Sequence, residues 1–225
     1  MSLVDFHSHI LPKADHGSDS IDVSLTQLNL ARKYGVKDII ATPHFYANKI
    51  NVDRFVELRD KSYRSLIDSV KIEIPTIYLG AEVFYCKNIE QMPDLDKLCI
   101  GNSNMILIEL PFGDCADECA KSVRNLLSMG YKVVLAHIER YSFDLIEQLI
   151  DLGAYAQLNS RILTKFFARS KYLKFLESRK IIGIGSDIHG CDEKAYKKFA
   201  STRAFIEKKY PYLLDLSDEI CSQIK

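Results

Sequence analysis

Short hydrophobic runs alternate along this chain with longer segments whose apolar residues recur at helical spacing. The pattern predicts seven strands, at Leu3–Phe6, Asp38–Ala41, Thr76–Leu79, Met105–Ile108, Lys132–Ala136, Tyr155–Leu158 and Ile181–Ile184. It also predicts helices at 20–34, 52–69, 114–129, 142–152 and 163–179, with two more after the last strand. Glycines follow several of these helices, as expected of residues that end a helix in the left-handed conformation.

Regular alternation of strand and helix indicates parallel strands joined by right-handed crossovers, hence an α/β sheet or barrel. The chain has 225 residues, of which 47% are hydrophobic, so one core suffices and we expect a single domain over residues 1–225. In a closed parallel barrel the carboxyl ends of all strands open on one face, where such folds build their active sites. Residues that end different strands would therefore become neighbours.

Composition excludes several classes of protein. Thirty Lys and Arg residues balance thirty Asp and Glu residues, so the chain lacks the basic character of a nucleic-acid binder. No apolar run approaches the roughly 18 residues that a membrane span needs. The six cysteines form no C-x-x-C pair and no secretory signal precedes them, so we expect reduced thiols in a cytoplasmic protein.

All six histidines lie at or just after the end of a hydrophobic run, often near an acid. His7 and His9 point to the same side of their strand because side chains alternate with period two, and Asp5 shares that side. Imidazole and carboxylate are ligands that divalent transition metals prefer, so their convergence would form a multinuclear metal site. The candidate ligands are His7, His9, His16, His44, Glu82, Glu109, His137, Asp187 and His189.

Each of these motifs is weak when taken alone. Two histidines at a strand end can simply bind water, and an isolated D-x-H between glycines is most often a polar loop. The loop Asp15-His16-Gly17 leaves open whether Asp15 or His16 is the ligand. Cys115 and Cys119 have no nearby second pair, so we interpret them as structural. What favours the metal hypothesis is that every histidine fits it.

The ordered motifs D-F-H-S-H, A-T-P-H, G-A-E, I-L-I-E, A-H-I-E-R-Y and G-S-D-I-H resemble those of the polymerase and histidinol phosphatase (PHP) family of metallohydrolases. The segment A-H-I-E-R-Y, with Leu158-Asn159-Ser160 after it, is most similar to the bacterial PHP-type protein tyrosine phosphatases of capsule and exopolysaccharide synthesis. The resemblance extends from Asp5 to about Gly190. One departure is His16, where those enzymes usually carry the second acid of D-D-G.

The resemblance implies a distorted (β/α)7 barrel, similar to a TIM barrel, with three divalent metal ions, commonly manganese, although zinc or iron would also suit such ligands. By position, His7, His9, Glu82 and Asp187 would hold the first ion. Glu82 would bridge to a second ion, completed by Glu109 and His137, and the third would take His16, His44 and His189.

Several divalent ions would lower the pKa of a shared water, so that a metal-activated hydroxide attacks a phosphate ester directly. The candidate catalytic residues are Arg140, Asp187 and His189. Arg140 could bind phosphate oxygens bidentately, or could form a surface ion pair with Glu139. A cysteine-based phosphatase is excluded, because no cysteine is followed six positions later by arginine.

The resemblance implies a phosphotyrosine phosphatase whose partner is a tyrosine-phosphorylated protein, for example a bacterial tyrosine autokinase. Two alternatives stay open: a phosphomonoesterase for histidinol phosphate or another small molecule, and a regulatory module that binds a phosphoprotein without turnover. A nuclease role is disfavoured by the neutral charge.

Overall fold

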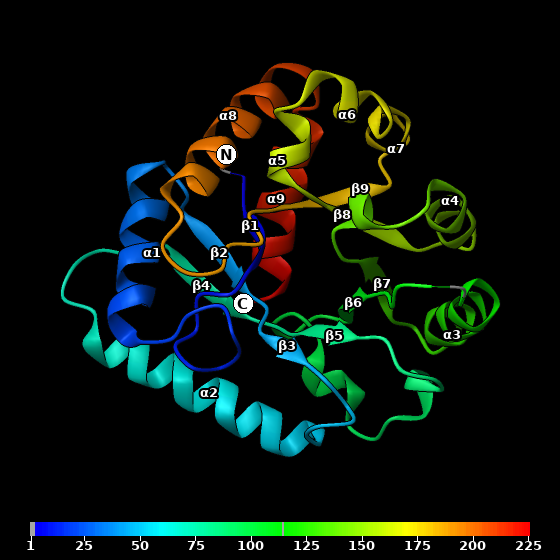
Figure 1. Cartoon of the computed structure of the whole chain (residues 1–225), viewed down its shortest axis with the longest axis horizontal. Helices are drawn as coiled ribbons and strands as arrows, with labels where there is room; N and C mark the ends of the chain where they lie inside the picture. Colours follow the sequence, from blue (N-terminus) through cyan, green and yellow to red (C-terminus); the bar gives the residue numbers. More distant parts are fainter. Residues whose placement is uncertain (1–2, 114) are drawn as a thin grey trace.

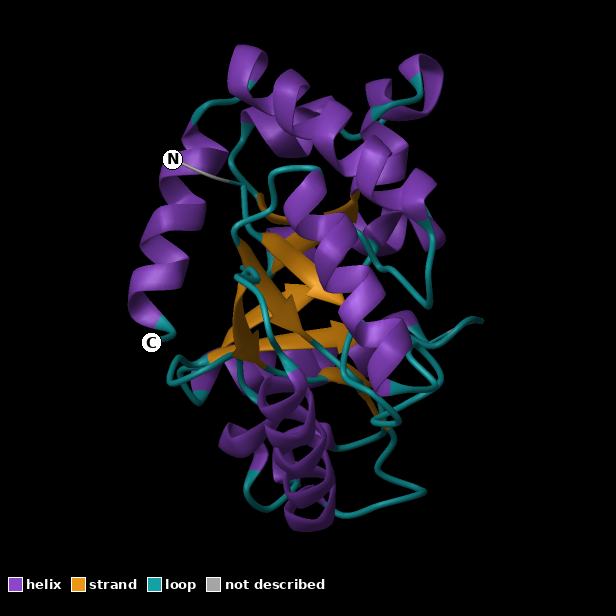
Figure 2. Ribbon diagram, turned by 90° about the vertical axis from the view of Figure 1, so that its left-hand side faces the viewer, coloured by secondary structure: helices purple, strands orange, loops and turns teal. Residues whose placement is uncertain are grey.

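The computed structural model describes residues 3–113 and 115–225, and its centre is a curled sheet of parallel strands with helices around it (Figures 1 and 2). Across the described residues the sheet order is β3-β5-β6-β7-β8-β9-β1-β2-β4. The strands are β1 (Asp5–Ser8), β2 (Asp38–Ala41), β3 (His44–Phe45), β4 (Thr76–Leu79), β5 (Glu82–Phe84), β6 (Met105–Glu109), β7 (Lys132–Leu135), β8 (Tyr155–Asn159) and β9 (Ile181–Gly185).

Each of the seven predicted runs corresponds to a strand, and the described sheet has two short strands more, β3 and β5. β3 begins just beyond β2, and β5 just beyond β4. The register is the same in both pairs, since Ala41 lies opposite Leu79 and His44 opposite Glu82. These two strands are too short and too polar at their ends for hydrophobic periodicity to identify them.

The helices begin and end close to the predicted positions in most cases. Four helices start at a side-chain cap, supplied by Ser20, Asn51, Ser142 and Asp192. The α-helices are α1 (Ile21–Lys33), α2 (Val52–Ser69), α3 (Ala116–Ser128), α4 (Phe143–Asp151), α5 (Ser160–Leu163), α6 (Phe166–Ser170), α7 (Leu173–Glu177), α8 (Glu193–Lys209) and α9 (Tyr212–Gln223). Short 3-10 turns cover Ile89–Gln91, Leu95–Leu98 and Ile138–Arg140. Asp114, where the predicted helix 114–129 starts, lies outside the described residues.

The prediction of one helix over 163–179 is wrong. That segment contains the end of α5 and two further short helices, α6 and α7. The apolar positions change phase between Phe167 and Tyr172, so one continuous helix could not bury both groups. Phe166 and Phe167 indeed stay 71% and 87% exposed.

Both faces of the sheet are buried, as is usual for parallel strands. Phe6, Ile40 and Leu107 belong to a cluster that also contains Ile220 and Ile224, the first in α9 and the second just after it. Their sequence neighbours, such as Ile39 and Ile106, belong to the main cluster, which the other helices cover. Successive strand residues therefore pack on opposite faces.

β1 departs from this rule, because its register shifts between Asp5 and Ser8. Cβ atoms placed on Gly183 and Gly185, two positions apart in β9, would meet the Phe6 ring and the His7 Cβ, so His7 lies on the same face as Phe6. The expectation that Asp5 shares the side of His7 is therefore wrong.

Two further predictions concern the surroundings of the protein. Among the described residues, no helix has the length and apolar character that crossing a membrane requires. All six cysteines are free thiols.

Candidate metal centre

The candidate ligands come together at the carboxyl ends of the strands. β1 and the loop after it carry three of them, and each of the others lies in or directly after β3, β5, β6, β7 or β9. Residues from the two ends of the chain meet here, since a backbone bridge joins His9 to His189. The nine residues are His7, His9, His16, His44, Glu82, Glu109, His137, Asp187 and His189.

Four of these side chains form what we call the inner cluster: His7, His9, Glu82 and Asp187. The Nε2 atoms of His7 and His9 are 3.0 Å apart, and each lies 3.3 Å from Oε2 of Glu82. Oδ1 of Asp187 lies 3.7 Å from the first imidazole and 3.6 Å from the second. His7, His9 and Glu82 are almost completely buried.

These separations suit a divalent cation. Four ligands placed about 2.1 Å from one centre lie about 3.4 Å from each other in a tetrahedron. Glu82 Oε2 is buried but has no hydrogen bond of good geometry among the described residues. A buried carboxylate oxygen without a partner is costly, and a cation would supply the missing interaction.

Glu82 also connects the inner cluster to its neighbours. Its Oε1 lies 2.6 Å from Nε2 of His137, and its Oε2 lies 3.0 Å from Nδ1 of His44. Glu109 lies 3.6 Å from each of these two imidazoles. The two oxygens of Glu82 therefore face different groups of imidazoles, which is the arrangement of a carboxylate that bridges two cations.

We call His16, His44 and His189 the outer cluster. The ring of His16 is centred 4.9 Å from that of His44 and 4.7 Å from that of His189. His9 stacks on His189 at 4.0 Å, so the two clusters share a border. Unlike the inner cluster, this group reaches solvent, because the His189 side chain is 29% exposed and His16 is exposed.

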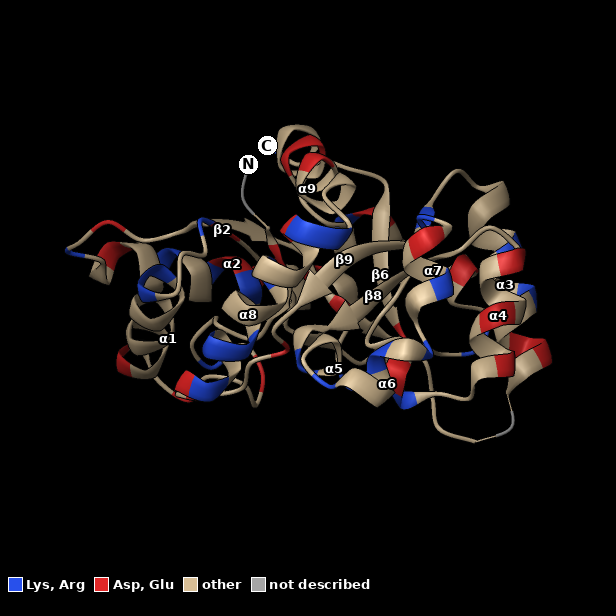
Figure 3. Cartoon of the chain, turned by 90° about the horizontal axis from the view of Figure 1, so that it is seen from above, with Lys and Arg blue, Asp and Glu red and all other residues tan. Residues whose placement is uncertain are grey.

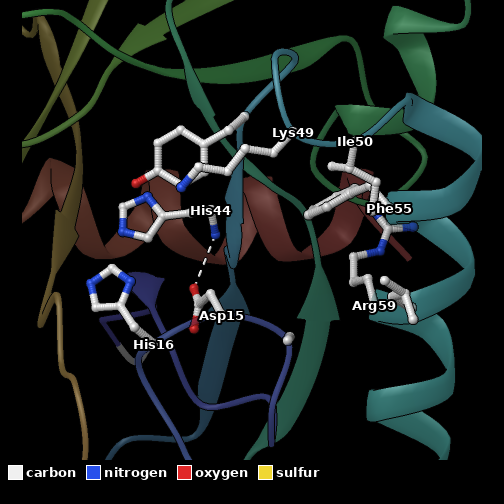
Figure 4. Close-up of a pocket in the computed structure, with 10 residues that line it drawn as sticks. Asp15, His16, His44, Lys49, Ile50, Phe55 and Arg59 are labelled. Atoms are coloured by element: carbon white, nitrogen blue, oxygen red, sulfur yellow. Dashed lines mark hydrogen bonds between the residues drawn. The ribbon is translucent and has the colours of Figure 1, made fainter.

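The structure separates the roles of Asp15 and His16. Asp15 accepts a hydrogen bond from Nδ1 of His9 at 2.6 Å and another from the backbone N–H of His44 at 3.0 Å. A carboxylate on Nδ1 leaves the Nε2 lone pair of His9 to face the inner cluster. Asp15 is therefore occupied in positioning His9, while His16 faces the outer cluster (Figure 4).

The acids and imidazoles strongly perturb one another. Burial lowers the pKa of His9, but its bonds to Asp15 and Glu82 outweigh this effect and raise it to about 10. Burial raises the pKa of Asp187, yet the charges of His7 and His9 bring it down to about 2. Several buried carboxylates therefore demand positive charge at this place, which protons or cations can provide.

The pKa of His189 is shifted in the opposite direction to that of His9. Burial, followed by the charge of His9, lowers the pKa of His189 to about 4. Its Nδ1 donates to the carbonyl oxygen of Asp187 at 3.2 Å, and its Nε2 has no hydrogen-bond partner in the described parts of the chain. His189 is thus neutral at pH 7 with a lone pair directed into the site, as a metal ligand must be.

Arg140 lies at the edge of the centre. Its guanidinium donates a short hydrogen bond to Asp187 Oδ2 and lies 3.7 Å from Oε1 of Glu109. Glu139 instead accepts from the backbone N–H of Asn159 and lies 3.9 Å from Arg161. The side chain of Arg140 is 31% exposed, so an anion can reach it.

A chain of amides supports the acidic residues. The sequence motifs include one of them, Asn159, whereas Gln157 was not identified from the sequence. Gln157 accepts from the backbone N–H of His137 at 2.6 Å and donates to Asn159 at 3.0 Å, and Asn159 donates to Asp187 at 2.9 Å. Gln157 and Asn159 are two positions apart in β8 and so share a face. Two amide residues two positions apart at the end of a predicted strand are the sequence feature that could have identified this chain of hydrogen bonds.

Backbone geometry at the site is unusual as well. His137 and Asp187 have φ angles of 31° and 52°, in the left-handed region that residues with a side chain seldom adopt. The sequence predicts close backbone approach at the glycines around Asp187, and a Cβ atom on Gly185 would come within 2.6 Å of the His7 Cβ. Glycine there lets β9 lie close to β1.

Charge elsewhere on the protein does not suggest another polyanion-binding function. Figure 3 shows basic and acidic residues interspersed on the helices α1, α3 and α8. The concentration of histidines and acids at the strand ends is therefore the feature that distinguishes the protein chemically.

Comparison with known proteins gives a family. Residues 3–221 match the family described as capsular polysaccharide synthesis, CpsB/CapC. The chain belongs to this family.

Its relatives carry related names. The chain is 30% identical over 207 residues to a putative tyrosine-protein phosphatase CapC of Staphylococcus aureus, covering 86% of this chain and 80% of the relative. It is 28% identical over 234 residues to the tyrosine-protein phosphatase YwqE of Bacillus subtilis, covering 97% and 91%. The chain also superposes on a crystal structure from the pair YwqE of Bacillus subtilis and CpsB of Streptococcus pneumoniae, described as unique metal-dependent tyrosine phosphatases. The TM-score is 0.77 at 25% identity, and the match covers 99% of this chain and 96% of that one. The resemblance expected from the sequence motifs is confirmed.

Proposed function

We propose that this protein is a metal-dependent protein tyrosine phosphatase that regulates capsular or exopolysaccharide synthesis. The observation that carries the proposal is the convergence of imidazoles and carboxylates around Glu82, with separations that suit bound cations. Membership of the CpsB/CapC family and the names of the relatives support the same activity.

The proposed cofactor is a set of three divalent cations, with manganese as the first candidate and zinc or iron as alternatives. When bound, such cations lower the pKa of water and neutralise phosphate oxygens. The inner cluster would hold the first, Glu82 with Glu109 and His137 the second, and the outer cluster the third. Asp15 would position His9 and leave the loop ligand to His16.

Arg140 is the residue proposed to bind the phosphoryl group. A guanidinium presents two parallel donors that match two phosphate oxygens, and its exposure makes it accessible to substrate. The hydrogen bond from Arg140 to Asp187 orients the guanidinium, and Asn159 donates a second hydrogen bond to the same carboxylate. Charge that develops on the phosphate oxygens would be offset there.

The leaving group favours tyrosine over an aliphatic alcohol. A tyrosyl phenolate has a pKa of about 10, so it departs with less help from a proton donor than an alkoxide needs. His189 is better suited to hold a cation than to donate a proton, because burial lowers its pKa to about 4.

We further propose the barrel architecture, the protein partner and the cellular compartment. β2 with β3, and β4 with β5, would each act as one interrupted strand, which gives a distorted seven-stranded barrel formed by residues 1–225 as one domain. The partner would be a tyrosine-phosphorylated protein such as a bacterial tyrosine autokinase. Six free thiols are typical of the reducing cytoplasm, where we place the reaction.

A substrate panel tests the function. Manganese-loaded protein should release phosphate from phosphotyrosine peptides over many turnovers, with a higher kcat/KM than on histidinol phosphate. Chelator and His7→Ala should each abolish this release. Preference for histidinol phosphate would replace the proposal by the small-molecule alternative, and tight phosphopeptide binding without turnover would replace it by a regulatory module.

A further inference from the structure

A pocket of about 400 Å³ lies beside the outer cluster (Figure 4). Three segments line it: the loop after β1, β3 with the loop that follows it, and the first two turns of α2. His16 and His44 form part of its wall, so any group held in the pocket lies next to the proposed cation ligands. The pocket is therefore placed to receive the part of a substrate that adjoins its phosphate.

The wall across from these histidines is apolar. Figure 4 shows Ile50 and Phe55 across the pocket from His16 and His44, and Leu58 completes this side. Leu58 is 39% exposed, although a large aliphatic side chain gains by being covered. A small polar phosphomonoester would gain nothing from such a wall, whereas an aromatic ring would.

The basic residues of the pocket do not form a second phosphate site. Arg59 already donates to Asp60, to the carbonyl oxygen of Gly80 and to that of Lys97. Lys49 lies with its Nζ 4.3 Å from the ring centre of Tyr46, on the rim. The interior is left with an apolar surface on one side and imidazoles on the other.

We propose that this pocket is the aryl subsite, in which Ile50, Phe55 and Leu58 contact the ring of phosphotyrosine while its phosphate lies at the cation ligands. The inference rests on the proposed phosphatase function and adds to it the residues that select an aromatic substrate. Discrimination by such a wall comes from apolar contact. One methylene group enclosed in a hydrophobic pocket is worth about 10-fold or more in selectivity, and a partly exposed side chain such as Leu58 contributes less per carbon atom.

Leu58→Ala is the informative variant, and the chain supplies a matched control. Ile67 lies on the same helix, is 37% exposed and does not line the pocket, so Ile67→Ala removes a similar aliphatic side chain elsewhere. The affinities of manganese-loaded wild type, Leu58→Ala and Ile67→Ala for phenylphosphonate and for inorganic phosphate should be measured by calorimetry. Both ligands offer phosphoryl oxygens, but only the first has a ring.

We expect Leu58→Ala to weaken phenylphosphonate binding roughly 5- to 10-fold and to leave phosphate binding unchanged. Ile67→Ala should alter neither. On phosphotyrosine peptides Leu58→Ala should raise KM and change kcat little, because a contact present in both ground and transition states contributes uniform binding. Equal weakening of both ligands, or no weakening of either, would overturn the inference.

A second aromatic surface provides the rival location. Phe112 is 75% exposed and its ring centre lies 5.9 Å from that of Tyr141, on the side of the centre that carries Arg140. A selective loss of phenylphosphonate affinity in Phe112→Ala, without one in Leu58→Ala, would place the ring there and also overturn the inference. Failure of the proposed function is recognised separately, since the wild type would then turn over no phosphotyrosine while the binding comparison still reports on the pocket.

Discussion

The inner and outer clusters use the same ligand types in two different environments. His7 and Glu82 lie in strands, His9 directly follows β1, all three are buried, and the carboxylate contacts both imidazoles. In the outer cluster, His16 and His189 lie in loops and reach solvent, and among the described residues Asp187 is the one carboxylate that forms an ion pair with either of them. His44, the third member, lies in β3 and is 3.0 Å from Glu82, so it borders the inner cluster. Strands fix ligand geometry at a cost in desolvation, whereas loops leave a site open to substrate. The comparison suggests that the inner cations hold the centre together and the outer one meets the substrate.

The largest effect is expected from Glu82→Gln, which attacks the inner cluster at its common ligand. The amide cannot bridge two cations, so kcat/KM on p-nitrophenyl phosphate should fall at least about 10³-fold, and bound metal should fall with it. Elemental analysis and steady-state kinetics measure both. Glu90→Gln is the control, since Glu90 is also a buried glutamate but bonds to Asn125 away from the centre. An active, fully metallated Glu82→Gln protein would refute the bridging role.

Arg140→Ala tests whether the guanidinium at the edge of the inner cluster binds the substrate phosphate. Loss of the bidentate donor should lower kcat/KM about 10²-fold while metal content is retained, and Arg140→Lys should recover only part of the loss. Arg161→Ala is the control, because Arg161 is a nearby arginine that pairs with Glu139 instead. Should Arg140→Ala lose its metal, the guanidinium would be a structural counter-ion of Asp187 and not a phosphate ligand.

His16→Ala sharpens the distinction between the clusters. We expect the affinity for one cation to fall at least about 10-fold, since even an indirect partner of a metal ligand contributes that much. Metal titration should then give one tightly bound ion fewer, with the inner ions unchanged. If Asp15→Asn and not His16→Ala removes a single ion, the loop ligand is Asp15.

The smallest expected effect is that of chelation on thermal stability, and it should develop in steps over time although turnover is abolished. A chelator should remove the exposed outer cation before the buried ones, so metal release should have a fast and a slow phase. Removal of one cation should lower the melting temperature by roughly 5 to 10 °C, because a cation held at about 100 times its Kd adds about 2.7 kcal/mol. Scanning calorimetry before and after each phase measures the effect. Release in a single phase would mean that the two clusters do not differ in access.

Sequence and structure contributed different parts of this description. The strands ending at His9, Glu109 and Asn159 could be predicted, because a hydrophobic run and the polar residue that ends it are local features. Since parallel strands end on one face, the histidines could also be placed together before any contact was known. The break between α5, α6 and α7 was missed, because hydrophobic periodicity does not show which face of a helical segment finds a packing partner.

Local sequence patterns are enough to show which side chains stand at the strand ends, and therefore that imidazoles and acids share one face. The folded structure was needed to show that Asp15 binds His9 and that Arg140 contacts Asp187 and not Glu139. It was also needed to show that Leu58 of α2 lines the pocket beside the same centre. The difference is one of range. Side-chain alternation and capping act over a few residues, whereas hydrogen-bond partners and pocket walls are chosen by the packing of distant segments.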